Sequence, residues 1–117
     1  MFIGIDASSS KRLEKLARED LHFQKLFNYS EGTSSPELLN LSNFSIMEAL
    51  FKALNCPTLF PRSEIRISRE ENGMPKLHLT GRMQETWKNY SFAVSVTHIE
   101  DLIIAVVVAD SNTTEQA

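Results

Sequence analysis

Three ionisable residues stand where charged side chains rarely lie without a role. Asp6 ends an apolar segment at the start of the chain, and Glu48 lies within a long apolar stretch, four residues before Lys52. Residues four apart share one face of a helix, so Lys52 lies one turn beyond Glu48. Mg²⁺ is typically held by one or two carboxylates, with water and phosphate oxygens at its other positions. The three residues therefore indicate a site for a divalent cation and a polyphosphate, with the lysine beside the phosphates.

Two other interpretations of these charges stay open. Glu and Lys at this spacing also form an ordinary surface ion pair worth about 0.2–0.5 kcal/mol, which is typical of a structural protein whose charges merely pair. The same residue types suit metal-dependent phosphodiester cleavage, and hence a nuclease. The net charge of -3 and the pI of about 5.6 disfavour nucleic acid as a partner, because nucleic-acid-binding domains are usually basic.

The composition is that of one globular domain. Of the 117 residues, 42% are hydrophobic and 23% are charged, and no linker or repeat divides the chain. The longest apolar run, Leu102–Ala109, is much shorter than the roughly 20 residues of a membrane-spanning helix, so no membrane partner is expected. We expect a single domain over residues 1–110 and a polar C-terminal tail over residues 111–117.

The start of the chain and its cysteine content bear on the compartment. Asp6 interrupts the apolar start at once, so no secretory leader is expected. Cys56 is the one cysteine and can form no internal disulfide, which is typical of a reducing compartment. We therefore expect a cytoplasmic protein.

Hydrophobic periodicity predicts the elements that must position the charged residues. They are a strand over 2–6, a helix over 11–27, a loop over 29–34, a long central helix over 35–55, strands over 64–68 and 76–80, a short helix over 81–88, and strands over 92–97 and 102–109. Asn72-Gly73 is typical of a tight hairpin turn, and the unbroken run 102–109 predicts a strand buried on both faces. The order favours an α+β fold, with a mostly antiparallel sheet packed on the long central helix.

The first predicted helix carries a basic face. Its cations follow one another in steps of three and four, with one more beside them: Lys11, Lys15, Arg18, His22 and Lys25, then Arg12. Apolar residues such as Leu13 and Leu16 share the opposite side. Such a face can steer an acidic partner, although a solvated helix surface has the same composition.

Four stretches, taken in order, resemble the holo-acyl-carrier-protein synthases, a family of small phosphopantetheinyl transferases. The stretches are Phe2-Ile3-Gly4-Ile5-Asp6, the helix from Phe44 to Leu54, Glu71-Asn72-Gly73-Met74-Pro75, and Val94-Ser95-Val96-Thr97-His98. They are similar to the family's Gly-Ile-Gly-Ile-Asp opening, its Phe-Ala-Ala-Lys-Glu-Ala-Phe-Ser-Lys-Ala-Leu helix, its Asn-Gly-Lys-Pro turn and its Val-Ser-(Leu/Ile)-(Ser/Thr)-His ending. The resemblance covers the chain from Phe2 to Asp110.

This resemblance implies a phosphopantetheinyl-transferase-like fold and a defined reaction. The family transfers 4′-phosphopantetheine from coenzyme A to a serine of apo acyl carrier protein, as in fatty acid biosynthesis. The products are the holo carrier and adenosine 3′,5′-bisphosphate. The resemblance also implies Mg²⁺ as cofactor, an acidic acyl carrier protein as partner, and a homotrimer whose sites lie between subunits.

Roles carry over to individual residues of this sequence. The resemblance implies that Asp6 and Glu48 hold Mg²⁺ and that Lys52 contacts a coenzyme A phosphate, which makes these three the catalytic residues. Either Glu48 or a metal-held water takes the serine proton. The remaining implied sites are an adenine slot at Gly73 and Pro75, a nucleotide contact at Thr97 and His98, and a carrier-docking face at Lys11, Arg12, Lys15 and Arg18.

Several cations of the family pattern are missing from this chain. The family's lysine before the helix glutamate is Met47, the arginine before the helix motif is Asn43, and the turn lysine is Met74. A charge-assisted hydrogen bond contributes roughly 1.5–3 kcal/mol, so these losses weaken the expected contacts to coenzyme A. They leave open a catalytically impaired relative that still binds acyl carrier protein, although the retained acids, Lys52 and His98 favour an active enzyme.

Overall fold

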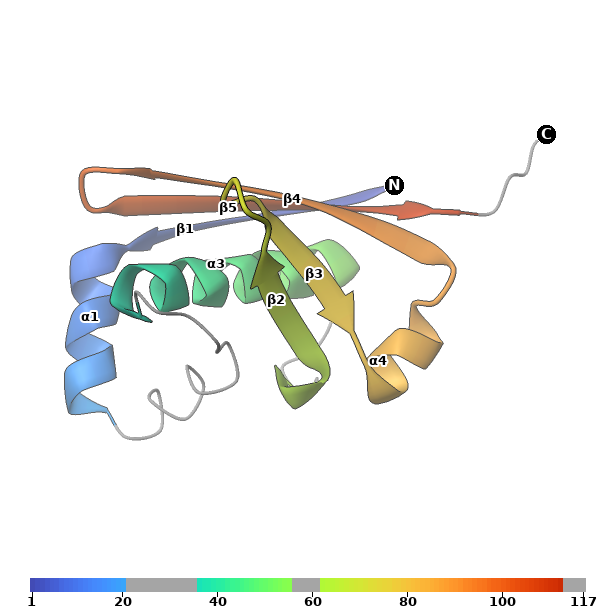
Figure 1. The fold of residues 1–117 in the computed structure, drawn as a ribbon, viewed down its shortest axis with the longest axis horizontal. Coiled ribbons are helices and arrows are strands. Elements are labelled where there is room, and N and C mark those ends of the chain that lie inside the picture. The colour runs from blue at the N-terminus through green and yellow to red at the C-terminus, as the bar shows by residue number, and fades with distance from the viewer. Residues whose placement is uncertain (21–35, 56–61, 113–117) are drawn as a thin grey trace.

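A three-stranded antiparallel sheet lies over one long helix, with a two-stranded hairpin beside it (Figure 1). The computed structural model describes residues 1–20, 36–55 and 62–112. The strands are β1 (Phe2–Ser9), β2 (Ile65–Arg69), β3 (Pro75–Leu79), β4 (Tyr90–Ile99) and β5 (Leu102–Ser111). The helices are α1 (Ser10–Glu19), α3 (Pro36–Leu54) and α4 (Gly81–Thr86), with a 3-10 turn, η1 (Arg62–Glu64). The α+β class and the antiparallel sheet on a long helix are thus confirmed.

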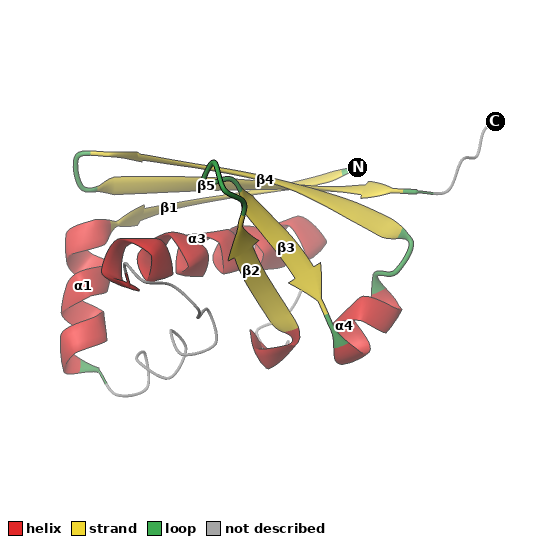
Figure 2. Ribbon diagram, in the orientation of Figure 1, coloured by secondary structure: helices red, strands yellow, loops and turns green. Residues whose placement is uncertain are grey.

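The larger sheet brings the two ends of the chain together. Its order is β1-β5-β4, so β1 pairs with the last strand, and both pairings are antiparallel (Figure 2). Asp6 lies opposite Ala105, which in turn lies opposite Val96. Because directly opposed residues point to the same face of a sheet, these three side chains share the face that is turned toward α3.

The core fills the space between α3 and the inner face of this sheet. Fully buried residues come from both layers: Ile46, Met47, Ala49 and Leu50 from α3, and Ile103, Ala105, Val107 and Ala109 from β5. The β2–β3 hairpin adds Ile65 and Ile67, and α4 adds Met83. Apolar residues on most sides of α3 therefore contact the sheet above and the hairpin beside it, as the sequence predicted.

The outer face of the sheet has no described element over it (Figure 1). Ile3 and Ile5 on β1 are 57% and 55% exposed, and the alternate residues of β5 are only half-buried. The expectation that residues 102–109 are buried on both faces is therefore wrong for the single protomer. The physical reason is that α3 covers one face of the sheet only.

Several boundaries differ from the sequence expectation. The first helix, expected to reach residue 27, ends at Glu19, because Asp20 is extended and forms its C-cap. The first strand continues to Ser9, whose hydroxyl accepts a hydrogen bond from the Arg12 amide at 3.2 Å and caps α1. Ser111, expected to start the tail, is the last residue of β5. The expected helix over 21–27 and loop over 29–34 lie outside the described residues. Within the described part of the chain, no helix is long and apolar enough to cross a membrane.

Candidate active site

Asp6 is held at the inner face of the sheet by two polar contacts. Its side chain is only 12% exposed. The hydroxyl of Ser8, two residues on and therefore on the same face, donates to Asp6 Oδ2 at 2.8 Å. Lys52 Nζ lies 3.2 Å from Asp6 Oδ1 and also donates to the Ile5 carbonyl at 3.1 Å. The Asp6 carboxylate therefore has a hydrogen-bond partner on each oxygen and is fixed in place.

Glu48 and Lys52 lie one turn apart on α3, but each pairs with a residue from another element. Lys52 pairs with Asp6 of β1, whereas Glu48 Oε2 accepts a hydrogen bond from Arg62 Nη2 at 2.5 Å. The side chain of Glu48 is 29% exposed and that of Arg62 is 19% exposed. Glu48 and Lys52 therefore do not form the surface ion pair that their spacing also allowed.

Arg62, in η1, is the charged residue of this region that the sequence did not single out. Its guanidinium lies over two rings of α3, 5.4 Å from the centroid of Phe44 and 4.8 Å from that of Phe51. Phe44, Glu48 and Phe51 follow one another by four and three residues, so they form one face of the helix. Two aromatic rings that flank a carboxylate suit an arginine, and this spacing is the signal that could have indicated a partner for Glu48.

The two carboxylates line the same pocket. The pocket has a volume of about 320 Å³ and lies where β1, α1 and α3 meet. Its lining residues are Asp6, Ala7, Ser8, Ser9, Arg12, Leu13, Leu16, Phe44 and Glu48. The interpretation of a structural protein with unrelated acids is disfavoured, because Asp6 and Glu48 converge on one space from distant parts of the sequence.

This donor set fits Mg²⁺. A hard cation prefers carboxylate oxygens, and Mg²⁺ commonly takes one or two of them and keeps the rest of its shell for water and phosphate. Asp6 and Glu48 supply two carboxylates on one open pocket. Within the described residues there is no group of three or more His, Cys, Asp and Glu side chains that could hold a metal ion.

The other expected coenzyme contacts lie outside this pocket. Gly73, with φ of +90°, lies in the turn between β2 and β3, and Pro75 starts β3. His98 lies in register with Ile103 and Ser8, so it shares the inner face with Asp6 but is exposed. Thr97, the neighbouring residue on the strand, faces the outer side. Within one protomer, Thr97 and His98 therefore point in opposite directions.

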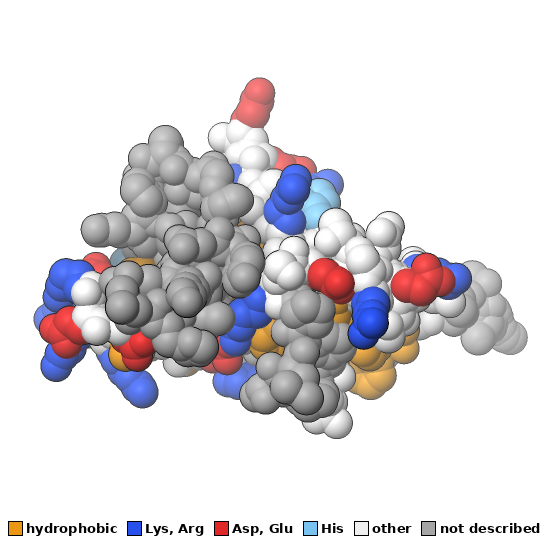
Figure 3. Space-filling view, turned by 90° about the horizontal axis from the view of Figure 1, so that it is seen from below, with side chains coloured by type: hydrophobic (Ala, Val, Ile, Leu, Met, Phe, Trp, Pro, Cys, Tyr) orange, Lys and Arg blue, Asp and Glu red, His pale blue; other side chains and the backbone are white. Residues whose placement is uncertain are grey.

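The expected docking face is present on α1. Lys11, Arg12, Lys15 and Arg18 are all exposed, whereas Leu13 is buried. Lys and Arg side chains gather at the end of the molecule that α1 forms (Figure 3). Arg12 also lines the pocket with the two carboxylates, so the basic face reaches the edge of the candidate site. His22 and Lys25 lie outside the described residues.

Two arginines approach the positions where the resemblance led us to expect cations on α3. Asn43 is 1% exposed, and its Oδ1 accepts a hydrogen bond from Arg69 Nη2 at 2.7 Å. Burial lowers the pKa of Arg69 below its ordinary value. Met47 is also 1% exposed, and its Sδ lies 3.9 Å from Arg62 Nη1. Met74 is exposed in the hairpin turn.

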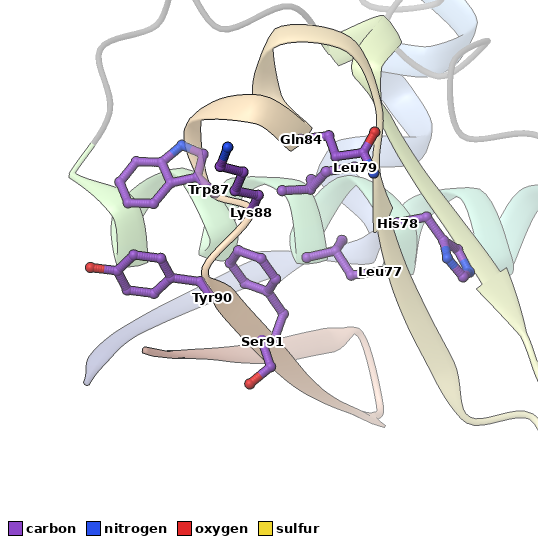
Figure 4. Close-up of a pocket in the computed structure, with 9 residues that line it drawn as sticks. Leu77, His78, Leu79, Gln84, Trp87, Lys88, Tyr90 and Ser91 are labelled. Atoms are coloured by element: carbon purple, nitrogen blue, oxygen red, sulfur yellow. The ribbon is translucent and has the colours of Figure 1, made fainter. Parts of the chain in front are cut away.

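A second pocket, of about 350 Å³, has a different chemistry (Figure 4). It lies between β3, α4 and β4, and its lining includes apolar and aromatic side chains, among them Leu77, Trp87 and Tyr90. Its lysine, Lys88, is paired with Glu85 at 3.1 Å, and His78 points away from the aromatic rings. No carboxylate lines it, so it offers no site for a divalent ion.

Comparisons with known proteins show what this chain is similar to. No protein-family model matches the chain. A protein named holo-[acyl-carrier-protein] synthase from Kocuria rhizophila is 31% identical over 112 residues, which cover 92% of this chain and 90% of that protein. One of the same name from Caldicellulosiruptor saccharolyticus is 27% identical over 116 residues, covering 92% and 94%. The crystal structure of Helicobacter pylori holo-[acyl-carrier-protein] synthase in complex with coenzyme A has a TM-score of 0.74 at 26% identity, covering 92% of this chain and 99% of that chain.

Proposed function

The chain belongs to the holo-[acyl-carrier-protein] synthase family, and from that premise we propose that it transfers 4′-phosphopantetheine from coenzyme A to a serine of an apo acyl carrier protein. The members of this family are transferases, so the protein is an enzyme. The observation that carries the proposal is that Asp6 and Glu48 line one pocket, with the ammonium group of Lys52 on Asp6.

The pocket residues have separate roles in the phosphoryl transfer. Asp6 and Glu48 would hold Mg²⁺, which when bound would supply positive charge to the diphosphate and its leaving group. Lys52, whose side chain is 56% exposed, turns its ammonium group from Asp6 to a coenzyme phosphate. The serine oxygen forms a bond to the β-phosphorus, the bond from that phosphorus to the bridging oxygen breaks, and adenosine 3′,5′-bisphosphate leaves. Carboxylates of the pocket are available to accept the serine proton.

The carrier protein approaches along α1. Acyl carrier proteins of this reaction are acidic, and Lys11, Arg12, Lys15 and Arg18 form the matching exposed surface. Arg12 belongs both to this surface and to the pocket lining. A carrier bound to α1 therefore presents its serine at the mouth of the pocket that holds the two carboxylates.

The complete site is shared between copies of the chain. A pocket of about 320 Å³ is small for a nucleotide coenzyme, since drug-sized ligands already occupy roughly 300–1,000 Å³. Gly73, Pro75, Thr97 and His98 do not line it in the protomer, and a neighbouring subunit brings its own set of these residues to the coenzyme. The exposed Ile3 and Ile5 on the outer sheet face are the apolar surface that a homotrimer buries.

An impaired relative that only binds the carrier is the second candidate. It is favoured by the absence of a cation at Asn43, Met47 and Met74. Against it, Arg62 lies at Met47 and Arg69 at Asn43, so positive charge is present at two of these three positions. A nuclease has no support from the comparisons. The cytoplasm, where thiols stay reduced, is the compartment that we propose for the reaction.

One incubation separates the two candidates. The protein is mixed with coenzyme A, Mg²⁺ and an apo acyl carrier protein, and the intact mass of the carrier is followed by mass spectrometry. The transferase adds one phosphopantetheine to the carrier and releases adenosine 3′,5′-bisphosphate in equal amount. A carrier that binds but keeps its apo mass identifies the impaired relative and overturns the proposal.

A further inference from the structure

Arg62 is fixed against the carboxylate of Glu48 by an ion pair and by contacts with other side chains of α3. Its Nη2 donates to Glu48 Oε2 at 2.5 Å, and its guanidinium lies over the rings of Phe44 and Phe51. The side chain is only 19% exposed. Arginine stays protonated at any physiological pH, so it cannot leave Glu48 by losing its charge. The Glu48 carboxylate is therefore paired with Arg62 unless a ligand competes for one of the two groups.

Both candidate metal ligands are already paired with a cation in the ligand-free protein. Asp6 pairs with Lys52 and Glu48 pairs with Arg62. Arg12 also lines the pocket. Among the described residues that line the pocket or pair with its acids, the two carboxylates are therefore outnumbered by three cations: Arg12, Lys52 and Arg62. A divalent cation that enters this pocket alone meets a net positive charge, whereas an anion meets an attraction.

We propose that Arg62 acts as a positioning residue that holds Glu48 in the coenzyme-free protein, so that the divalent ion binds together with the diphosphate of coenzyme A and not before it. This inference rests on the proposed function. The diphosphate reverses the sign of the charge in the pocket, attracts Lys52 away from Asp6, and supplies oxygens of its own to the ion. Arg62 thereby sets the order in which substrate and metal load.

The first experiment uses the unaltered protein and needs no turnover. Binding of Mn²⁺, as a probe for the divalent site, is measured from the electron paramagnetic resonance signal of the free ion, without carrier protein. Coenzyme A is expected to tighten Mn²⁺ binding by about tenfold or more, the scale of one charge interaction in a partly exposed site. Adenosine 3′,5′-bisphosphate, which lacks the diphosphate, is expected to give little tightening. Equal Mn²⁺ affinity with and without coenzyme A overturns the inference.

The second experiment assigns the effect to Arg62. Arg62→Met keeps an apolar side chain against Phe44 and Phe51 but removes the charge, and it is expected to bind Mn²⁺ alone about tenfold more tightly than the unaltered protein. Arg62→Lys keeps the charge and is expected to retain the dependence on coenzyme A. Arg66→Met, an exposed arginine of β2, serves as the matched control and should behave like the unaltered protein.

A merely structural ion pair predicts a different pattern. In that case Arg62→Met lowers the thermal midpoint but leaves the affinity for Mn²⁺ alone unchanged, and this result overturns the inference. If Arg62→Met does not fold, Arg62→Gln is the substitute, because it keeps the length of the side chain near the carboxylate and is judged by the same Mn²⁺ titration.

The inference and the proposed function can fail separately. In one outcome, Mn²⁺ binding depends on coenzyme A, this dependence is lost in Arg62→Met, and the carrier protein gains no mass. That outcome supports the inference and overturns the transferase proposal. A carrier that gains phosphopantetheine, together with tight Mn²⁺ binding to the coenzyme-free protein, supports the transferase and overturns the inference.

Discussion

Gly4 on β1 lies directly against the backbone of Ala49 on α3. A β-carbon at Gly4 would lie 2.0 Å from the carbonyl oxygen of Ala49 and 2.5 Å from the amide nitrogen of Ala53. Both distances are far below van der Waals contact, so only glycine allows strand and helix to approach this closely. Asp6 lies two residues beyond Gly4, and Glu48 immediately precedes Ala49. The contact therefore fixes the spacing between the two candidate metal ligands.

Gly4→Ala is expected to impair both stability and activity. The added methyl group meets backbone atoms, which no change of rotamer can relieve, so β1 must move away from α3. We expect a loss of about 3 kcal/mol in the free energy of unfolding, measured by urea denaturation. Transfer falls as well, because Asp6 moves with the strand. A Gly4→Ala protein with unaltered stability and rate would contradict this account of the site.

Gly73→Ala is the matched comparison for stability. Gly73 has φ of +90°, which disfavours alanine, but no other atom lies within 4 Å of the position of its β-carbon. The cost is therefore only the strain of the turn, about 1 kcal/mol. A larger loss of stability in Gly73→Ala than in Gly4→Ala would show that the turn constrains the fold more than the close approach of β1 to α3.

Most of the fold follows from local patterns in the sequence. The hairpin of β2 and β3 could be predicted because Asn72-Gly73 separates two alternating segments, and the helix start at Pro36 because proline suits a first turn. The extra length of β1 could not, because Ala7, Ser8 and Ser9 are weak strand formers. They join the sheet because β5 offers them partners as far as Leu102.

The candidate site shows the same division between local and distant information. Asp6, Glu48 and Lys52 stand out because charged residues are unexpected in apolar segments. The spacing of Phe44, Glu48 and Phe51 could have indicated an arginine partner for Glu48. It could not have identified Arg62, or paired Lys52 with Asp6, because both pairs join distant elements. Arg62 in particular belongs to no periodic pattern of its own.

Glu48→Gln is expected to abolish transfer while the fold remains. The amide keeps the shape of the side chain but removes the negative charge that a divalent ion requires, so we expect a loss of about 100-fold or more in the rate of carrier modification. Arg62 then lacks its carboxylate, and the free energy of unfolding falls by roughly 1–3 kcal/mol. Intact-mass kinetics and urea denaturation measure the two effects.

Glu85→Gln is the control for the loss of one acid. Glu85 also pairs with a cation, Lys88, but its side chain is 75% exposed and lies on α4, away from the pocket with the carboxylates. Exposed pairs contribute little, so both rate and stability should match those of the unaltered protein. If Glu48→Gln retains the full rate of transfer, Glu48 is not the acid that the reaction needs.

Charge reversal on α1 is expected to affect the carrier and not the coenzyme. The double variant Lys11→Glu/Lys15→Glu places two acids on the face that meets an acidic partner, so KM for the carrier should rise about tenfold or more at low salt, with kcat nearly unchanged. The difference should shrink as added salt screens the charges. Initial rates against carrier and coenzyme concentration separate the two parameters. Lys88→Glu is the control, and an equal effect there would point to net charge instead of a docking face.

Ile5→Asp tests whether the outer face of the large sheet is the surface between subunits. Ile5 is 55% exposed beside Ile3 and points away from α3, so a charge there costs little in the isolated protomer. Within an assembly the same carboxylate is buried without a partner, which is strongly unfavourable. We expect the unaltered protein to sediment as a trimer and Ile5→Asp as a monomer in analytical ultracentrifugation, with transfer lost because the coenzyme contacts of the neighbour are absent. Thr86→Asp, an exposed residue at the end of α4, should leave the assembly unchanged. An Ile5→Asp protein that stays trimeric would place the interface elsewhere, and full activity in a monomer would show that one chain alone completes the site.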